Sequence, residues 1–263
     1  MKADINGTTL AYSDSGNGLA LVLIHGFPLC RKMWRPQAEA LAGAGCRVIT
    51  PDLRGFGESG PSSVTVNMDI YADDIVALMD HLGIDRAAIG GMSMGGYVLL
   101  NLLERYPERV AAPIFIVTKA GGDDDAGKAR RTALAEACHT QGIRPVADAF
   151  RTILFTPETL TDNPALVEKV FGWIDATDPR GAAAALIAMR DRKDYVARLG
   201  GVSQPALVIG ADQDHASPVE NSYIIAHGLA QAELCILHGG GHMVNLEQPE
   251  GFNEAILEFL AGL

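Results

Sequence analysis

The chain has 263 residues, with 48% hydrophobic and 20% charged side chains, which is the composition of an ordinary globular protein. A chain of this length forms one large domain or two small ones, and it can bury a core without disulfides or metal ions. Its formal net charge of −11 argues against nucleic acid and anionic membrane surfaces as partners, and fits a protein that acts on small neutral molecules.

The apolar runs and the cysteines indicate a cellular compartment. No apolar run is long enough to span a bilayer, and the residues after Met1 lack the apolar stretch of a signal peptide. The cysteines have no C-x-x-C spacing, which is typical of reduced cysteines rather than of disulfides or zinc ligands; they are Cys30, Cys46, Cys138 and Cys235. We expect a cytoplasmic monomer or homodimer with no bound metal.

Strands and helices alternate over the first 118 residues. Residues 3–12 predict a β-hairpin that turns at Asn6-Gly7, a dipeptide that favours a type I′ turn. The unbroken apolar run at residues 19–24 is typical of a strand buried on both faces of a parallel sheet. Further strands are predicted at residues 47–50, 87–89 and 112–117, and helices at residues 34–41, 67–82 and 97–103.

The pattern changes at residues 119–199, where short helical segments separated by Gly and Pro predict an insertion of three to five helices. The alternation then resumes, with strands predicted at residues 206–209 and 233–237 and helices at residues 219–229 and 250–260. We therefore predict an α/β fold with a parallel sheet covered by helices on both faces. Residues 1–118 and 200–263 would form the core, with residues 119–199 as a helical insertion.

The pattern G-x-S-x-G at residues 91–95 has Ser93 at its centre, between a predicted strand and a predicted helix. In this context the glycines permit a very tight turn, which pushes the serine hydroxyl clear of the sheet. The first N–H groups of the helix would point in the same direction and stabilise negative charge. The pattern favours Ser93 as a nucleophile over a glycine-rich turn that merely contains serine.

A serine nucleophile requires a base and a carboxylate that orients the base. We favour His242 as the base, because Gly239-Gly240-Gly241 precedes it just after the last predicted strand and lets the loop turn sharply. Asp212 and Asp214 follow the penultimate strand, and both remain open as the carboxylate. Asp52, which follows an early strand, is a third candidate, but a residue that caps its own loop is the better interpretation there.

The order Ser93, Asp214, His242 is that of the α/β-hydrolase triad. With these residues in place the chain resembles the α/β-hydrolase fold superfamily, in its branch of small cofactor-free serine esterases, enol-lactonases and haloperoxidases. Three segments carry the resemblance besides the serine motif: His25-Gly26-Phe27-Pro28, the loop at residues 52–59, and Gly239-Gly240-Gly241-His242. The resemblance implies a mostly parallel, eight-stranded sheet, no cofactor, and a cap formed by the insertion.

The resemblance also implies roles for individual residues. The acid of this family usually lies four residues before a proline, as Asp214 does before Pro218, which favours Asp214 over Asp212. The oxyanion hole would consist of the backbone N–H groups of Phe27 and Met94. Candidate pocket residues are Trp34, Phe150, Trp173 and Met243, although aromatic residues at helical spacing in the insertion are also typical of that segment's own core.

We predict a serine hydrolase that cleaves a small carboxylic ester or lactone through an acyl-enzyme on Ser93. Other activities of this family remain open: enol-lactone hydrolysis or C–C bond hydrolysis in aromatic catabolism, and perhydrolase or haloperoxidase activity. The alternative from a different class is a ligand sensor of the same fold that keeps the triad while its main task is to bind a partner.

Overall fold

The computed structural model of the chain describes residues 1–61 and 65–263. Its strands confirm every predicted strand: β1 (Lys2–Ile5), β2 (Thr8–Ser15), β3 (Leu19–Ile24), β4 (Cys46–Pro51), β5 (Ala87–Met92), β6 (Val110–Ile116), β7 (Ala206–Ala211) and β8 (Ala232–Leu237). Asn6 and Gly7 form the first turn with positive φ angles of 46° and 75°, as a type I′ turn requires.

The eight strands form one sheet in the order β1-β2-β4-β3-β5-β6-β7-β8. The pairs β1–β2 and β2–β4 are antiparallel, and the remaining neighbours are parallel. The sheet is therefore mostly parallel, as predicted. The six parallel strands β3 to β8 end at the same edge, so the loops that leave them meet there.

Helices cover both faces of the sheet. They are α1 (Arg35–Gly43), α2 (Met68–His81), α3 (Met94–Arg105), α9 (Glu220–Gly228) and α11 (Pro249–Ala261), and the short α10 (Val244–Glu247) packs against α11. Strand β3 shows why its run is continuously apolar. Val22 and Ile24 join the core beneath α2 and α3, whereas Leu21 and Leu23 join the core beneath α1 and α11. Among the described residues, no helix is long and apolar enough to cross a membrane.

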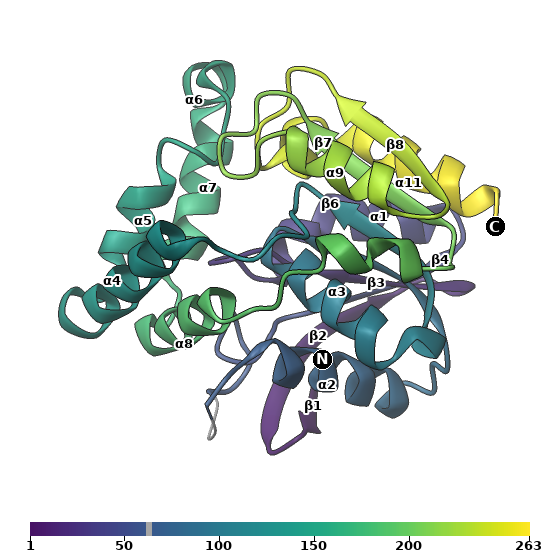
Figure 1. The fold of residues 1–263 in the computed structure, drawn as a ribbon, viewed down its shortest axis with the longest axis horizontal. Helices are drawn as coiled ribbons and strands as arrows, with labels where there is room; N and C mark the ends of the chain where they lie inside the picture. Colours follow the sequence, from purple (N-terminus) through teal and green to yellow (C-terminus); the bar gives the residue numbers. More distant parts are fainter. Residues whose placement is uncertain (62–64) are drawn as a thin grey trace.

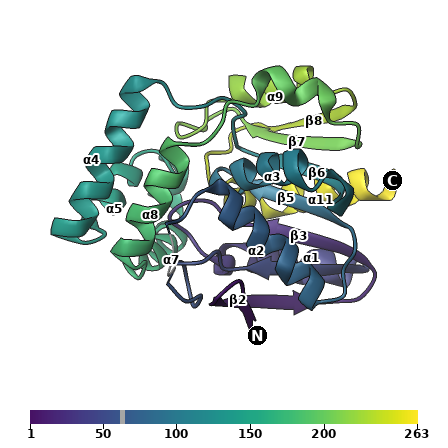
Figure 2. The same ribbon diagram turned by 60° about the horizontal axis from the view of Figure 1, so that its bottom comes forward.

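Five α-helices lie between β6 and β7, where every residue is described: α4 (Asp125–Gln141), α5 (Arg144–Phe150), α6 (Pro157–Asp162), α7 (Pro164–Asp175) and α8 (Pro179–Arg190). They gather beside the sheet at the left of both views (Figures 1 and 2) and are called the cap below. Prolines stand at the first or second position of α5 to α8, where the missing N–H group costs no helical hydrogen bond.

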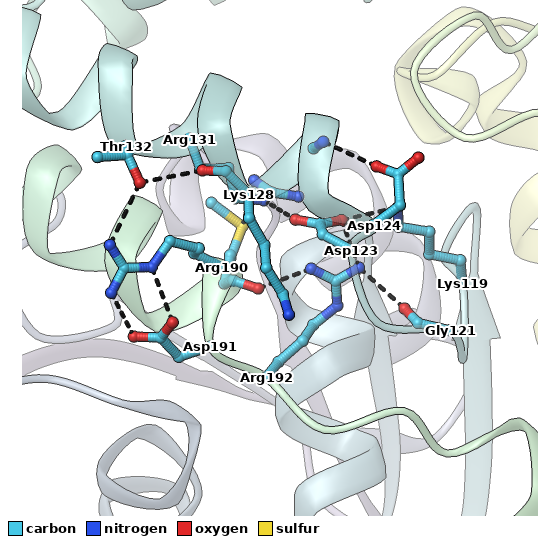
Figure 3. A network of polar contacts seen from close by, with 12 residues as sticks. Lys119, Gly121, Asp123, Asp124, Lys128, Arg131, Thr132, Arg190, Asp191 and Arg192 are labelled. Atoms are coloured by element: carbon cyan, nitrogen blue, oxygen red, sulfur yellow. Dashed lines mark hydrogen bonds and ion pairs between the residues drawn. The ribbon is translucent and has the colours of Figure 1, made fainter.

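The segments by which the chain enters and leaves the cap lie side by side, and Asp123 connects them (Figure 3). Its carboxylate accepts from Lys119 at 3.0 Å on the entering segment and from Arg192 at 2.8 Å on the leaving segment, and it also binds Arg131 of α4. Burial alone would raise the pKa of Asp123, but the hydrogen bonds from Arg192 and Arg131 outweigh burial and hold this pKa well below its usual range.

Candidate active site

Ser93 occupies a strained turn between β5 and α3. Its backbone has φ 52° and ψ −111°, a conformation that residues other than glycine rarely adopt. The Ser93 N–H donates to the Ile116 carbonyl oxygen at 3.0 Å, and the Thr118 hydroxyl donates to the Ser93 carbonyl oxygen at 2.7 Å. The turn exposes part of Ser93, whereas Met92 and Met94 on either side are fully buried.

The glycines beside Ser93 are required by close backbone contacts. A Cβ atom on Gly91 would lie 2.3 Å from the Gly95 carbonyl oxygen, and one on Gly95 would lie 2.3 Å from the Ile24 carbonyl oxygen. Both distances are far below van der Waals contact, and both involve backbone atoms that have no rotamer to change. Only glycine fits at these positions, as the tightness of the predicted turn requires.

His242 and Asp214 form a buried pair at the same edge of the sheet. The Nδ1 atom of His242 lies 2.7 Å from Oδ2 of Asp214, and the side chains are 2% and 0% exposed. The other carboxylate oxygen of Asp214 accepts from the backbone N–H groups of Ala216 and Ser217 at 2.7 and 2.8 Å. With both of its oxygens held, the carboxylate fixes the ring with Nδ1 as the donor, which leaves Nε2 able to accept a proton.

The two other candidate acids do not contact His242. Asp212 instead binds Nδ1 of His238 at 2.8 Å and the Gly239 N–H at 2.7 Å, in an exposed position. Asp52 is buried. It accepts from the backbone N–H and guanidinium of Arg31 and from the Glu58 N–H, so it stabilises its own loop and attaches it to the segment of Arg31.

The segment His25-Gly26-Phe27-Pro28 leaves β3 and passes next to Ser93. A Cβ atom on Gly26 would lie 3.3 Å from Cβ of Ser93, so the two backbones approach closely here. The His25 ring accepts from the Leu53 N–H at 3.0 Å through Nε2, and its Nδ1 lies 2.9 Å from the Gly26 carbonyl oxygen. Burial lowers the pKa of His25, which favours the neutral ring. The two ring contacts connect the loop after β3 with the loop after β4.

The backbone N–H groups of Phe27 and Met94 flank this point. Within residues 1–61 and 65–263, neither group donates a hydrogen bond to another protein group. Met94 is the first residue of α3, where an N–H group has no partner within the helix and the helix dipole favours negative charge. Both groups are therefore candidate donors for the predicted oxyanion hole.

The four candidate pocket residues occupy different places. Phe150 is half-buried with its ring 5.7 Å from that of Phe27, and Met243 is buried directly after His242. Trp34 is instead a core residue, fully buried against Phe252. Trp173 lines a hollow of about 580 Å³ that Arg31, Lys32 and Lys169 also line, with the Lys169 ammonium 5.6 Å from its ring centroid.

Thr118 is a residue at this site that the sequence patterns did not single out. Its hydroxyl holds the Ser93 carbonyl oxygen, and its side chain leaves no room for a Cβ atom on Gly96. The available signal was positional, because Thr118 follows β6, the strand adjacent to β5. Among the described residues, no group of three or more His, Cys, Asp or Glu side chains is arranged to hold a metal ion.

The sheet order, the strained serine between β5 and α3, and the loops that gather at the carboxyl ends of the strands define an α/β hydrolase. The chain belongs to the alpha/beta hydrolase fold family, whose model matches residues 20–249.

Three relatives illustrate this similarity. An esterase from Thermogutta terrifontis has 36% identity and a TM-score of 0.96, covering 100% of this chain and 98% of its own. The enol-lactonase from Burkholderia xenovorans LB400 has 28% identity and a TM-score of 0.92, with coverages of 99% and 100%. A 3-oxoadipate enol-lactonase from Acinetobacter baylyi is 33% identical over 210 residues, which cover 80% of this chain and 76% of the relative.

Proposed function

We propose that this α/β hydrolase is a serine hydrolase that cleaves a small carboxylic ester or lactone through an acyl-enzyme on Ser93. The observation that carries the proposal is the buried His242–Asp214 pair, at 2.7 Å, on the loops that leave β7 and β8 at the same sheet edge as Ser93. A histidine whose Nδ1 is held by a carboxylate presents Nε2 as a base, which is the activation that a serine hydroxyl requires.

The reaction follows from these groups. His242 removes the proton of the Ser93 hydroxyl as its oxygen attacks the substrate carbonyl, and Asp214 stabilises the imidazolium that forms. The N–H groups of Phe27 and Met94 donate to the oxyanion, and each such donor contributes about 2.7–4 kcal/mol of transition-state stabilisation. His242 then protonates the leaving alkoxide. Water resolves the acyl-enzyme by the same steps, and the cycle requires no cofactor.

The cap supplies the remaining wall of the site in this proposal. Phe150 at the end of α5 packs against Phe27, and the Met243 N–H donates to the Leu154 carbonyl oxygen at 3.0 Å. These contacts connect the cap to the segment of Phe27 and to the loop of His242, so we assign residues 119–199 as a cap over the substrate. Phe150 and Met243 would then present apolar surface to it.

Hydrolysis of p-nitrophenyl acetate, butyrate and octanoate by the wild type and by Ser93→Ala tests the proposal. We expect the wild type to hydrolyse at least the shorter esters and Ser93→Ala to lose the activity, because Ser93 carries the acyl group in the proposed mechanism. The preferred chain length measures the size of the acyl pocket. Equal hydrolysis by the two proteins would refute the proposal.

Enol-lactone hydrolysis is the second candidate, because two of the relatives described above are enol-lactonases. The same residues would act, with the ring oxygen of the lactone as the leaving group. Comparing kcat/KM for a γ-lactone and for an acyclic ester of equal size separates the two candidates. A fluorophosphonate that labels the wild type but not Ser93→Ala would show an activated serine even where neither substrate reacts.

A further inference from the structure

The histidine loop contacts the cap through residues on both sides of His242. The Gly241 N–H donates to Oε2 of Glu247 at 2.9 Å, while the Thr156 N–H of the cap donates to Oε1 of the same carboxylate at 3.0 Å. On the other side, the Met243 N–H donates to the Leu154 carbonyl oxygen at 3.0 Å. His242 thus lies between two attachments to one cap segment.

The contact between these backbones is direct. A Cβ atom on Gly241 would lie 2.9 Å from both the Thr156 backbone nitrogen and Oε2 of Glu247, so the loop and the cap segment leave no space for a side chain. Leu154 and Thr156 are 0% and 2% exposed, and Phe155 between them packs on Phe171 of α7. The cap segment at residues 154–156 is therefore itself fixed within the cap.

Glu247 has the chemistry that this bridge requires. A carboxylate has two oxygen acceptors, and here each one receives a backbone N–H group from a different part of the chain. Glu247 lies in α10, and its own N–H donates to the Met243 carbonyl oxygen at 2.9 Å, so its position is tied to that of the histidine loop. No role in the proposed reaction explains an acid at this point.

We propose that Glu247 is a positioning residue that fixes the loop of His242 against the cap segment at residues 154–156, so that the catalytic base is aligned only when the cap is in place. The inference rests on the proposed function of His242. It predicts that the bridge affects the turnover step more than substrate binding, because a displaced imidazole slows proton transfer while the apolar pocket still accepts the acyl chain.

The first test compares Glu247→Ala with the wild type, using p-nitrophenyl butyrate at saturating and subsaturating concentrations. We expect kcat to fall about 10- to 100-fold, the scale for misplacement of a catalytic group by about 1 Å, with KM changed less than threefold. Glu247→Gln keeps only one acceptor oxygen and should lie between the two. Glu250→Ala is the matched control, since Glu250 is an exposed acid at the start of α11 and should leave kcat unchanged.

A second variant tests the same bridge from the cap side. Thr156→Pro removes the N–H group that donates to Oε1 of Glu247 and puts a proline ring carbon in its place, so it breaks the bridge from the cap side. The φ angle of Thr156 is −68°, which proline also adopts. Thr156→Ala keeps the N–H group and loses only the hydroxyl that caps α6, so it controls for the cap. We expect Thr156→Pro to lower kcat well below that of Thr156→Ala, and this comparison decides if Glu247→Ala does not fold.

The outcomes separate this inference from the proposed function. If Ser93→Ala is inactive while Glu247→Ala and Thr156→Pro keep the wild-type kcat, the positioning role is wrong and the serine mechanism stands. A rise in KM at constant kcat would also overturn the inference, because the bridge would then act only on substrate binding. If Ser93→Ala remains active, the mechanism itself fails, and the role of Glu247 fails with it.

Discussion

Two histidine–aspartate pairs lie on the loops that follow β7 and β8, and their hydrogen bonds are nearly equal in length. His242–Asp214 measures 2.7 Å and His238–Asp212 measures 2.8 Å. The side chains of the first pair are 2% and 0% exposed, whereas those of the second are 83% and 36% exposed. The pairs therefore differ in their exposure to water rather than in their geometry.

The difference in burial distinguishes the pair that we propose as the catalytic base and its carboxylate from a pair on the surface. Water around His238 and Asp212 screens their interaction and lets both side chains exchange partners. For His242 and Asp214, the low exposure removes that competition, and the N–H groups of Ala216 and Ser217 hold the carboxylate in place. A fixed imidazole at the sheet edge is what the proposed acyl transfer requires of its base.

The largest effect that this comparison predicts is on activity, for Asp214→Asn. The amide still accepts the N–H groups of Ala216 and Ser217 through its oxygen, but its NH₂ group then faces Nδ1 of His242. The ring must accept at Nδ1 and carry its proton on Nε2, where it cannot take the proton of Ser93. We expect kcat/KM for p-nitrophenyl butyrate to fall about 10⁴-fold.

Asp212→Asn is the matched control, with the same chemical change at nearly the same hydrogen-bond length. We expect its kcat/KM to stay within about twofold of the wild type, as is usual for a substitution at an exposed pair. If Asp212→Asn lost activity as Asp214→Asn does, burial would not be what distinguishes the two pairs.

The residues after the strands could be predicted from the sequence because tight turns need glycine and because catalytic loops leave the carboxyl ends of parallel strands. This reasoning found Ser93 and His242 as candidates, but residue spacing alone left Asp212 and Asp214 open. Two residues apart on one loop, they differ only in the side-chain environment that the folded loops create.

Other features depend on contacts that no local pattern reports. An aromatic residue at helical spacing can face a pocket or a core, and Trp34 belongs to the core because α11 places Phe252 against it. Glu247 resembles any acid near a helix terminus until the fold brings Thr156, 91 positions away in the chain, to its carboxylate. Such roles arise from tertiary packing, which periodicity and motif spacing do not encode.

The same contrast extends to stability, where two ion pairs of equal length differ in burial. Arg192–Asp123, where the chain enters and leaves the cap, and Arg35–Glu39 on α1 both measure 2.8 Å. The side chains of the first pair are 3% and 4% exposed, and those of the second are 76% and 66% exposed. Asp123→Asn leaves the buried Arg192 guanidinium without its carboxylate. We expect it to lower the free energy of unfolding by about 3 kcal/mol.

Glu39→Gln, the exposed counterpart, should lower the free energy of unfolding far less, because water screens an exposed i,i+4 ion pair. Urea unfolding of both variants and the wild type at neutral pH measures the difference. Equal losses for the two variants would show that burial does not control the strength of these ion pairs.

The smallest predicted effect concerns the exposed pair and its dependence on pH. The hydrogen bonds of Asp212 with His238 and with the Gly239 N–H lower the pKa of this carboxyl below its usual value. A group whose pKa is lower in the folded state stabilises the protein above its unfolded pKa of about 3.9 and loses that contribution as the pH falls through the folded value. Because the pair is exposed, the contribution should be under about 1 kcal/mol.

The difference in unfolding free energy between the wild type and Asp212→Asn should therefore be present at pH 6 and shrink as the pH falls below about 3.9. It should also shrink in 0.5 M NaCl, because added salt screens an exposed pair. The loss of kcat/KM in Asp214→Asn should not respond to salt, since it arises from the tautomer of a buried ring rather than from screened attraction. A salt-dependent Asp214→Asn defect would place both pairs in the same electrostatic environment and remove the distinction that burial draws between them.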